Sequence, residues 1–305
     1  MARLIVSLKC FDGWTSEPAD GVHLQSTLDY ITPLADGFLI PLSFHELEDL
    51  SDGGVSALRS HAVLSVLPHT TVRAIWERPE TTICLPPITD LVDGAEPILA
   101  GILAEIMESV GVFRFSLPIE SVEAAQRLRK LTAHLSPFIT LTVWNVGQNA
   151  RVHDELSALM SNDSQITFAV KARDWMSEDA QIGLMRTTSF CQSHLERYSM
   201  LRWSAPSSTH RAYHNRDLPS YLVAGSEHQE PAWPLDALPQ DGFIVVEGST
   251  PVNASPLLMR EIQRVGELCC STRDTNIVQA ESLETTIRPD RKPLEAGQLE
   301  AANGS

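Results

Sequence analysis

Two short apolar runs with an amphipathic segment between them limit the fold more than any other part of the sequence. Residues 139–143 (ITLTV) and 166–170 (ITFAV) are typical of strands buried on both faces of a parallel sheet. Residues 151–161, between them, carry apolar side chains at helical spacing. Residues 177–179 then resemble an N-cap followed by first-turn acids. The stretch predicts a strand–helix–strand–helix unit of an α/β protein.

The same alternation continues through most of the chain. Short apolar strands with helices in nearly every gap predict an α/β fold, a (β/α)8 TIM-type barrel rather than an open sheet. The expected strands are residues 4–8, 37–42, 71–76, 112–117, 139–143, 166–170, 200–204 and 221–224, with 82–85 as a short extra strand. The expected helices are residues 21–34, 53–67, 90–110, 122–135, 151–161 and 179–196.

Past residue 240 the pattern starts again. Residues 243–247 form a ninth apolar run, which an eight-stranded barrel does not accommodate, and residues 257–265 follow as a helix. Residues 271–305 are polar and acidic, so a loosely ordered tail is expected. The predicted domains are a barrel (1–240), a short strand–helix extension from a truncated second domain (241–270) and the tail (271–305). Because the extension would leave an apolar face uncovered, it is expected to pack on the barrel or on a second chain.

The charge balance restricts the partners of the chain. Lysine and arginine number 23 against 39 aspartate and glutamate residues, a formal net charge of −16 without any basic cluster. This argues against direct nucleic-acid binding. The five cysteines include no C-x-x-C pair, which favours reduced thiols inside the cell. No signal peptide or membrane span is predicted, so the expected location is intracellular, in the nucleus or the cytoplasm.

Five segments carry a family resemblance. Four of them are similar in order to strands two, three, four and six of type I 3-dehydroquinate dehydratase, in the version embedded in the fungal pentafunctional AROM polypeptide. The fifth is similar to the beginning of shikimate dehydrogenase, the next enzyme along that polypeptide. Together the likeness covers about residues 4–266 and implies a TIM-type barrel. The segments are ADGFLIPLSF (35–44), VRAIWERPE (72–80), VGVFRFSLPIE (110–120), ITFAVKARDWMSED (166–179) and FIVVEGSTPVNASPLLMREIQRVG (243–266).

The resemblance also implies that the family's catalytic groups are replaced. It places the Schiff-base lysine at Phe168 and the paired histidines at Trp144 and Asn145. Dehydration through an imine needs an amine nucleophile and a proton shuttle, and none of these three side chains supplies either. Lys171 lies three residues further along the strand, on the opposite face and roughly 10 Å away. The resemblance therefore implies a pseudoenzyme, and no cofactor is expected.

A dehydratase-like barrel without the catalytic set, followed by a dehydrogenase-like start, is similar to the central part of the fungal quinate repressors. This resemblance implies a non-catalytic regulatory domain of a transcriptional repressor of quinate utilisation. Its implied partner is the transcriptional activator protein of the quinate pathway rather than DNA, which agrees with the acidic charge. Quinate, shikimate and 3-dehydroquinate are the candidate ligands.

Four residues are candidate ligand contacts. Arg211 lies near the family's substrate arginine, Lys171 ends the sixth strand, and Trp76 and Trp233 are expected at the barrel mouth beside Trp144. The tryptophans fit a reshaped ligand site, hydrophobic filling of a disused pocket, or a protein contact equally well. An alternative is an enzyme with altered chemistry on a cyclic hydroxy acid, of the dehydratase or lyase class. It would use Lys171, Arg211 or Asp174.

Other kinds of site have little support in the sequence. His210 and His214 are four residues apart, but no third metal ligand accompanies them, and no metal site is expected. A G-x-S-x-G elbow is missing, which argues against a serine hydrolase. The turn after residue 247 has no G-x-G-x-x-G, so a nucleotide site there is not expected.

Overall fold

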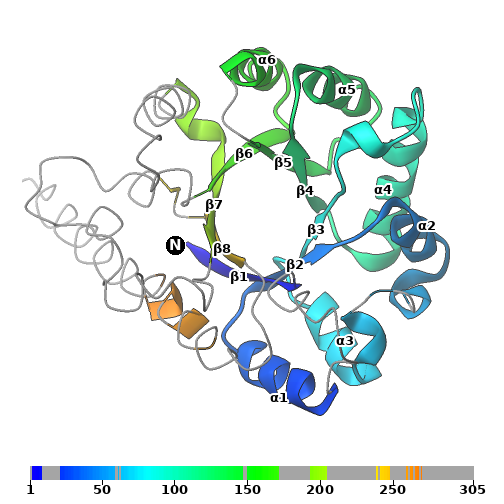
Figure 1. Cartoon of the computed structure of the whole chain (residues 1–305), viewed down its shortest axis with the longest axis vertical. Coiled ribbons are helices and arrows are strands. Elements are labelled where there is room, and N and C mark those ends of the chain that lie inside the picture. Colours follow the sequence, from blue (N-terminus) through cyan, green and yellow to red (C-terminus); the bar gives the residue numbers. More distant parts are fainter. Residues whose placement is uncertain are drawn as a thin grey trace, which may run out of the picture.

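The structure, a computed structural model, is a closed barrel of eight parallel strands in chain order. Figure 1 shows the strands around a common centre with the helices outside them. The (β/α)8 barrel predicted from the sequence is confirmed. The structure describes residues 2–8, 21–58, 61, 63–146, 150–171, 193–204, 238–239, 241–247, 259, 262–263, 265–267 and 269. The strands are β1 (Arg3–Ser7), β2 (Gly37–Pro41), β3 (Thr82–Cys84), β4 (Arg114–Ile119), β5 (Thr140–Asn145), β6 (Ile166–Lys171), β7 (Tyr198–Ser204) and β8 (Phe243–Glu247).

Four of the six predicted helices are present within about six residues of their expected bounds, and most of the helix predicted at 179–196 lies outside the described residues. The segment predicted as a helix over residues 53–67 instead holds two separate 3-10 turns. A helix that the prediction missed, α2, begins after Ser43, whose hydroxyl accepts from the Glu46 amide while the Glu46 carboxylate accepts from the Ser43 amide. This capping box is a sequence signal that could have identified α2. The helices are α1 (Gly21–Ile31), α2 (Phe44–Gly53), α3 (His69–Trp76), α4 (Glu96–Val110), α5 (Val122–Thr132) and α6 (Ala150–Met160).

The third strand was predicted in the wrong place. Residues 71–76 belong to α3, and the run taken for a short extra strand is β3, which pairs with β2 and β4. The β-branched composition of residues 71–76 favoured a strand. Burial follows the helical period instead, because Val72, Ile75 and Trp76 are buried together on one face. Pro68, in extended conformation at the N-cap, precedes the helix.

The eighth strand is also not the expected one. Residues 243–247 form β8, which pairs with both β7 and β1 and closes the barrel. They are therefore not a ninth strand outside it, and the predicted boundary at residue 240 falls within the barrel. The run at 221–224, predicted as the eighth strand, lies outside the described residues. Ile262, Val265 and Cys269 are buried in the main core, so this part of the extension packs on the barrel.

Side-chain alternation along the strands produces two apolar layers. One layer fills the space between strands and helices, with residues such as Val6, Phe38, Phe115 and Leu141. The other fills the barrel interior, because successive residues of a strand point to opposite faces. Polar Ser116 takes the corresponding place in β4, fully buried. The interior apolar residues are Ile5, Leu39, Cys84, Trp144, Ala169, Met200, Phe243 and Val245.

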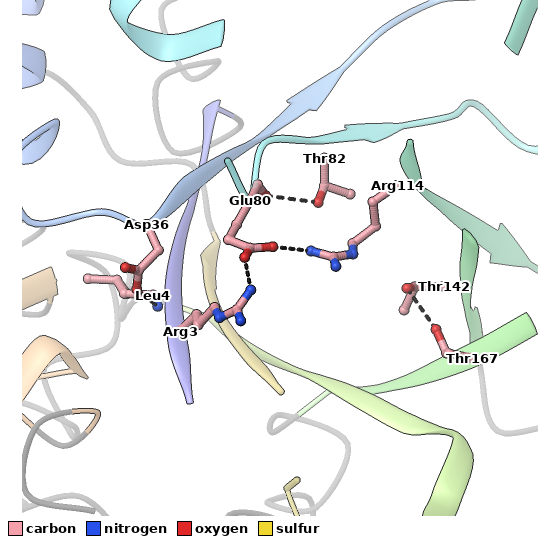
Figure 2. Close-up of polar contacts among 8 residues, drawn as sticks. All are labelled: Arg3, Leu4, Asp36, Glu80, Thr82, Arg114, Thr142 and Thr167. Atoms are coloured by element: carbon pink, nitrogen blue, oxygen red, sulfur yellow. Dashed lines mark hydrogen bonds and ion pairs between the residues drawn. The ribbon is translucent and has the colours of Figure 1, made fainter. Parts of the chain in front are cut away.

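A charged cluster closes the barrel at the amino ends of its strands. We call it the barrel floor and define it as Arg3, Glu80, Arg114 and Phe243. Figure 2 shows the buried Glu80 carboxylate between the two guanidinium groups, with one oxygen on each. Both guanidiniums also lie over the Phe243 ring, at 5.9 Å for Arg3 and 4.2 Å for Arg114. Burial, with the charge of Arg3, lowers the pKa of Arg114 to about 10, while Asp241 acts in the opposite sense.

Gly37, at the start of β2, lets the chain approach the barrel floor closely. A Cβ atom at this position would lie 2.3 Å from the backbone carbon of Glu80. Neighbouring backbone groups are tied to the same place, since the Glu80 amide donates to the Asp36 carbonyl and the Asp36 carboxylate accepts from the Leu4 amide. Figure 2 shows the Asp36 contact beside the floor. Only glycine therefore allows β2 and the segment before β3 to pack at this distance.

His153 on α6 makes the stability of the barrel dependent on pH. Its side chain is buried, and burial lowers its pKa to about 4, with the Asp154 charge opposing the shift. In the unfolded chain the imidazole has a pKa near its ordinary value of 6.5. Below that pH the unfolded state takes up the proton first, so stability present above pH 6.5 is lost as the pH falls toward 4.

We expect the free energy of unfolding to fall by up to about 3 kcal/mol across this interval because of His153 alone. Denaturant unfolding of the wild type and of His153→Gln, measured between pH 7 and about 4, tests this. The variant should lose that part of the pH slope, whereas His45→Gln, at an exposed histidine, should keep it. An unchanged slope in His153→Gln would contradict the assignment.

Candidate functional site

The described part of the chain contains a cavity of about 540 Å³ at the carboxyl ends of the strands, the edge that we call the barrel mouth. Catalytic and ligand-binding groups of (β/α)8 barrels lie at this edge, and the volume is that of a small-molecule site. Segments at the ends of β2, β3, β4, β5 and β7 form the wall. The lining residues are Pro41, Leu42, Ser43, Glu46, His61, Cys84, Leu85, Pro86, Pro87, Pro118, Glu120, Trp144, Val146 and Arg202.

A buried arginine is the main charged group of this mouth cavity. Arg202, on β7, is 3% exposed, and its Nε and Nη2 both donate to Oε2 of Glu247 on β8, at 2.8 and 2.5 Å. Its guanidinium carbon lies 3.5 Å from the centre of a Trp144 ring. A buried ion pair is costly unless its geometry is favourable. Here the two hydrogen bonds to Glu247 and the stacking on Trp144 hold the Arg202 guanidinium in one orientation.

His61 lines the same cavity but is engaged in backbone contacts. Its Nε2 lies 3.0 Å from the Pro41 carbonyl oxygen, and its Nδ1 accepts from the amides of Val63 and Leu64, at 3.2 and 3.1 Å. Since a carbonyl only accepts, Nε2 carries the proton and the ring is in its neutral Nε2–H form. His61 therefore holds the segment between the two 3-10 turns to the end of β2, and neither ring nitrogen is available as a base.

The rest of the wall is about as polar as it is apolar, and it includes two acids. Four prolines (Pro41, Pro86, Pro87 and Pro118) and several aliphatic side chains line it, and prolines have no backbone donor. Glu46 uses one carboxylate oxygen to cap its own helix, and Glu120 is exposed at the end of β4. Within the described part of the chain, the wall thus has few hydrogen-bond donors and several acceptors.

Comparison with known proteins adds little beyond the fold. No protein-family model and no curated protein matches the chain. Among solved structures, a catalytic-lysine mutant of the sialic acid aldolase of Ruminococcus gnavus is similar, at 12% identity and a TM-score of 0.41, over 92% of this chain and 77% of the aldolase chain. A likeness at this level assigns no activity. The barrel assignment rests on the strand order itself.

Of the predicted site residues, Trp144 is placed as expected. It points into the barrel and lines the mouth cavity. Asn145 ends β5 and is half-buried, but it is not among the lining residues. The side chain of Lys171, and the whole of Asp174, Arg211 and Trp233, lie outside the described residues, so these predictions remain untested.

Two predicted positions are corrected by the geometry. Phe168 lies in the layer between strands and helices, where its ring stacks on Tyr198 with centroids 5.3 Å apart. It therefore does not occupy an interior position as a Schiff-base lysine would, and Ala169 is the neighbouring interior residue of β6. Trp76 ends α3, before the amino end of β3, and is not at the mouth. Both errors come from matching segments without knowing which face or which element they belong to.

Sequence reasoning missed the Arg202–Glu247 pair and His61. A signal for the pair was present: each is the only charged residue of its strand, YSMLRWS for β7 and FIVVE for β8. Charged residues in such strands are rare without a partner. The predicted domain boundary at residue 240, however, places Glu247 in a different domain from Arg202. No local pattern marks His61.

Metal and membrane features can be reported only for the residues that the structure describes. Within them, no three histidine, cysteine, aspartate or glutamate side chains form a group that could hold a metal ion. His210 and His214 lie outside this part of the chain. The described helices include none with the length and apolar character required to cross a membrane.

Proposed function

We propose that the chain is a non-catalytic regulatory protein whose barrel keeps a ligand cavity but carries out no dehydration. The observation that supports this best is how the titratable groups of the mouth cavity are used. His61 has both ring nitrogens on backbone groups, and the Arg202 charge is paired with Glu247. No lysine lines the cavity within the described residues. Imine chemistry needs an amine and a mobile proton, and these groups supply neither.

The regulatory part of the proposal rests on the sequence resemblance to the fungal quinate repressors. On this hypothesis the protein represses quinate utilisation by binding the transcriptional activator of the pathway. The net charge of −16 favours a protein partner over DNA. Quinate, shikimate or 3-dehydroquinate would then either bind in the barrel or play no direct part in its function.

The purified protein is expected to show no turnover of 3-dehydroquinate above the rate in buffer. The conjugated product absorbs in the ultraviolet, so a continuous absorbance assay is the measurement, with calorimetric titration of quinate and shikimate alongside. Turnover that disappears in Lys171→Met would overturn the proposal and favour an enzyme with altered chemistry. Co-purification with the activator, absent for an unrelated barrel of similar charge, would support the regulatory role.

A further inference from the structure

His61 is a buried titratable residue whose ring joins two parts of the mouth cavity. It lies between the two 3-10 turns that follow α2, and it is 3% exposed. Its Nε2 meets the Pro41 carbonyl at the end of β2, and its Nδ1 accepts from the amides of Val63 and Leu64, where the second turn begins. The ring thus ties the segment after α2 to the strand before α2, and it forms part of the cavity wall itself.

These contacts require the neutral form of the ring. Nδ1 can accept from the two amides only while it carries no proton, because a protonated imidazole has donors at both nitrogens and no acceptor. Both amide contacts are buried, and a buried amide that loses its acceptor is strongly unfavourable. Protonation and the closed arrangement therefore exclude each other, so acid favours an arrangement that frees the ring. Histidine is the side chain that ordinarily changes charge between about pH 5 and pH 8.

The titratable and charged groups that share the cavity with this ring come from four other elements. They are Glu46 on α2, Cys84 on β3, Glu120 after β4 and Arg202 on β7. Among the described residues, none of them makes a hydrogen bond or an ion pair with the imidazole. The charge of Arg202 is paired with Glu247, so the two cavity carboxylates are the charges left to act on a ring that turns into the cavity. Carboxylates stabilise an imidazolium and not a neutral imidazole.

We propose that His61 is a pH-sensitive latch of the mouth cavity. The neutral ring closes the wall by holding the segment between the two 3-10 turns to the end of β2. The protonated ring gives up the two amides and turns toward Glu46 and Glu120, which opens the wall and changes the space that a ligand meets. This goes beyond the proposed function, because it concerns what controls the cavity and names no ligand.

An NMR titration of the wild type from about pH 8 to about pH 5 tests the latch. At the upper end the ring nitrogen resonances of His61 should report the neutral Nε2–H form, and the amides of Val63 and Leu64 should be protected from hydrogen exchange. As the ring takes up a proton, the protection of these two amides, relative to an unstructured peptide at the same pH, should fall by at least about tenfold. The methyl resonances of Leu42 and Leu85, elsewhere on the cavity wall, should shift over the same pH range.

His61→Gln and His45→Gln are the matched variants. Glutamine keeps a donor and an acceptor but does not titrate, so His61→Gln should lose the pH response of the Val63 and Leu64 amides. His45 is an exposed histidine on α2, and His45→Gln should keep that response. The amide of Leu128, buried in α5, separates the latch from a loss of stability of the whole barrel, because its protection should not follow the titration of the ring.

Four results would each overturn the latch. The ring of His61 stays neutral down to about pH 5, or it becomes charged while the two amides keep their protection. The cavity methyl groups do not follow the ring, or the pH response of the amides persists in His61→Gln. The first three are measured on the wild type, so they decide the question even if His61→Gln fails to fold. Turnover of 3-dehydroquinate would overturn the proposed function and leave this titration unaffected.

Discussion

Replacing Glu80 with alanine is expected to lower the free energy of unfolding by roughly 3 kcal/mol or more. Removing one partner of a buried ion pair leaves an uncompensated charge, which costs about 3–5 kcal/mol. Here one carboxylate pairs with two guanidiniums, those of Arg3 and Arg114, and both lie against the same Phe243 ring. The variant would leave two like charges facing each other at the barrel floor. Because Arg3 is partly exposed, water stabilises part of its charge, and we expect a loss of stability near the lower end of this range.

Denaturant unfolding at pH 7 measures this effect, and Glu77→Ala is the control. Glu77 pairs with Arg73 at 2.6 Å, but both side chains are mostly exposed, so Glu77→Ala should change the free energy of unfolding far less than Glu80→Ala does. Equal losses in the two variants would show that the barrel floor is no more important than a surface pair. Glu80→Gln, which keeps the shape and part of the hydrogen bonding, should fall between the wild type and Glu80→Ala.

Arg127→Met should destabilise the barrel by about 3–5 kcal/mol, through contacts that join α5 to the start of α4. Arg127 is 5% exposed, and its Nε donates to Glu96 at 2.7 Å. Its two terminal nitrogens donate to the carbonyls of Leu91 and Val92, at 2.8 and 2.9 Å. Methionine fills a similar volume but leaves a buried carboxylate and two carbonyls without donors.

Arg129→Met on the same helix is the control, because Arg129 is more than half exposed and its contact with Glu155, at 3.4 Å, is long for a hydrogen bond. It should change the free energy of unfolding by less than about 1 kcal/mol.

The Arg127→Met variant should also change how the free energy of unfolding depends on pH in acid. Burial raises the pKa of Glu96, but the hydrogen bond and charge of Arg127 outweigh it, and the net shift is downward. The wild type therefore gains stability above the unfolded pKa of a glutamate, and Arg127→Met should lose that gain. Destabilisation no larger than in Arg129→Met would contradict the role of the pair.

The sequence alone was enough to predict the barrel, for a local reason. Strands such as 139–143 and 166–170 are apolar because they are buried on both faces, and the helix between them carries its apolar face at a 3.6-residue period. These signals need only the neighbouring residues. Where two local signals conflicted, as in residues 71–76, packing decided in favour of the helix and the prediction failed.

The mouth cavity was less predictable, because its residues come from strands far apart in the chain. Trp144 could be placed at a strand end from its neighbours alone. The Arg202–Glu247 pair could not be inferred before residues 243–247 were known to close the barrel, 45 residues after Arg202. The sequence also left open whether Phe168 faces the barrel interior or the surrounding helices, because a shift of one residue along a strand exchanges these two faces.

Local periodicity thus determined the class of fold and the position of most strands and helices, and composition determined the acidic character that argues against nucleic-acid partners. Tertiary structure decided which apolar run closes the barrel, which side chains face its interior, and which charges meet. The physical reason is range: helical and strand patterns are set within about ten residues, whereas burial of a charge depends on partners brought together only when the barrel closes.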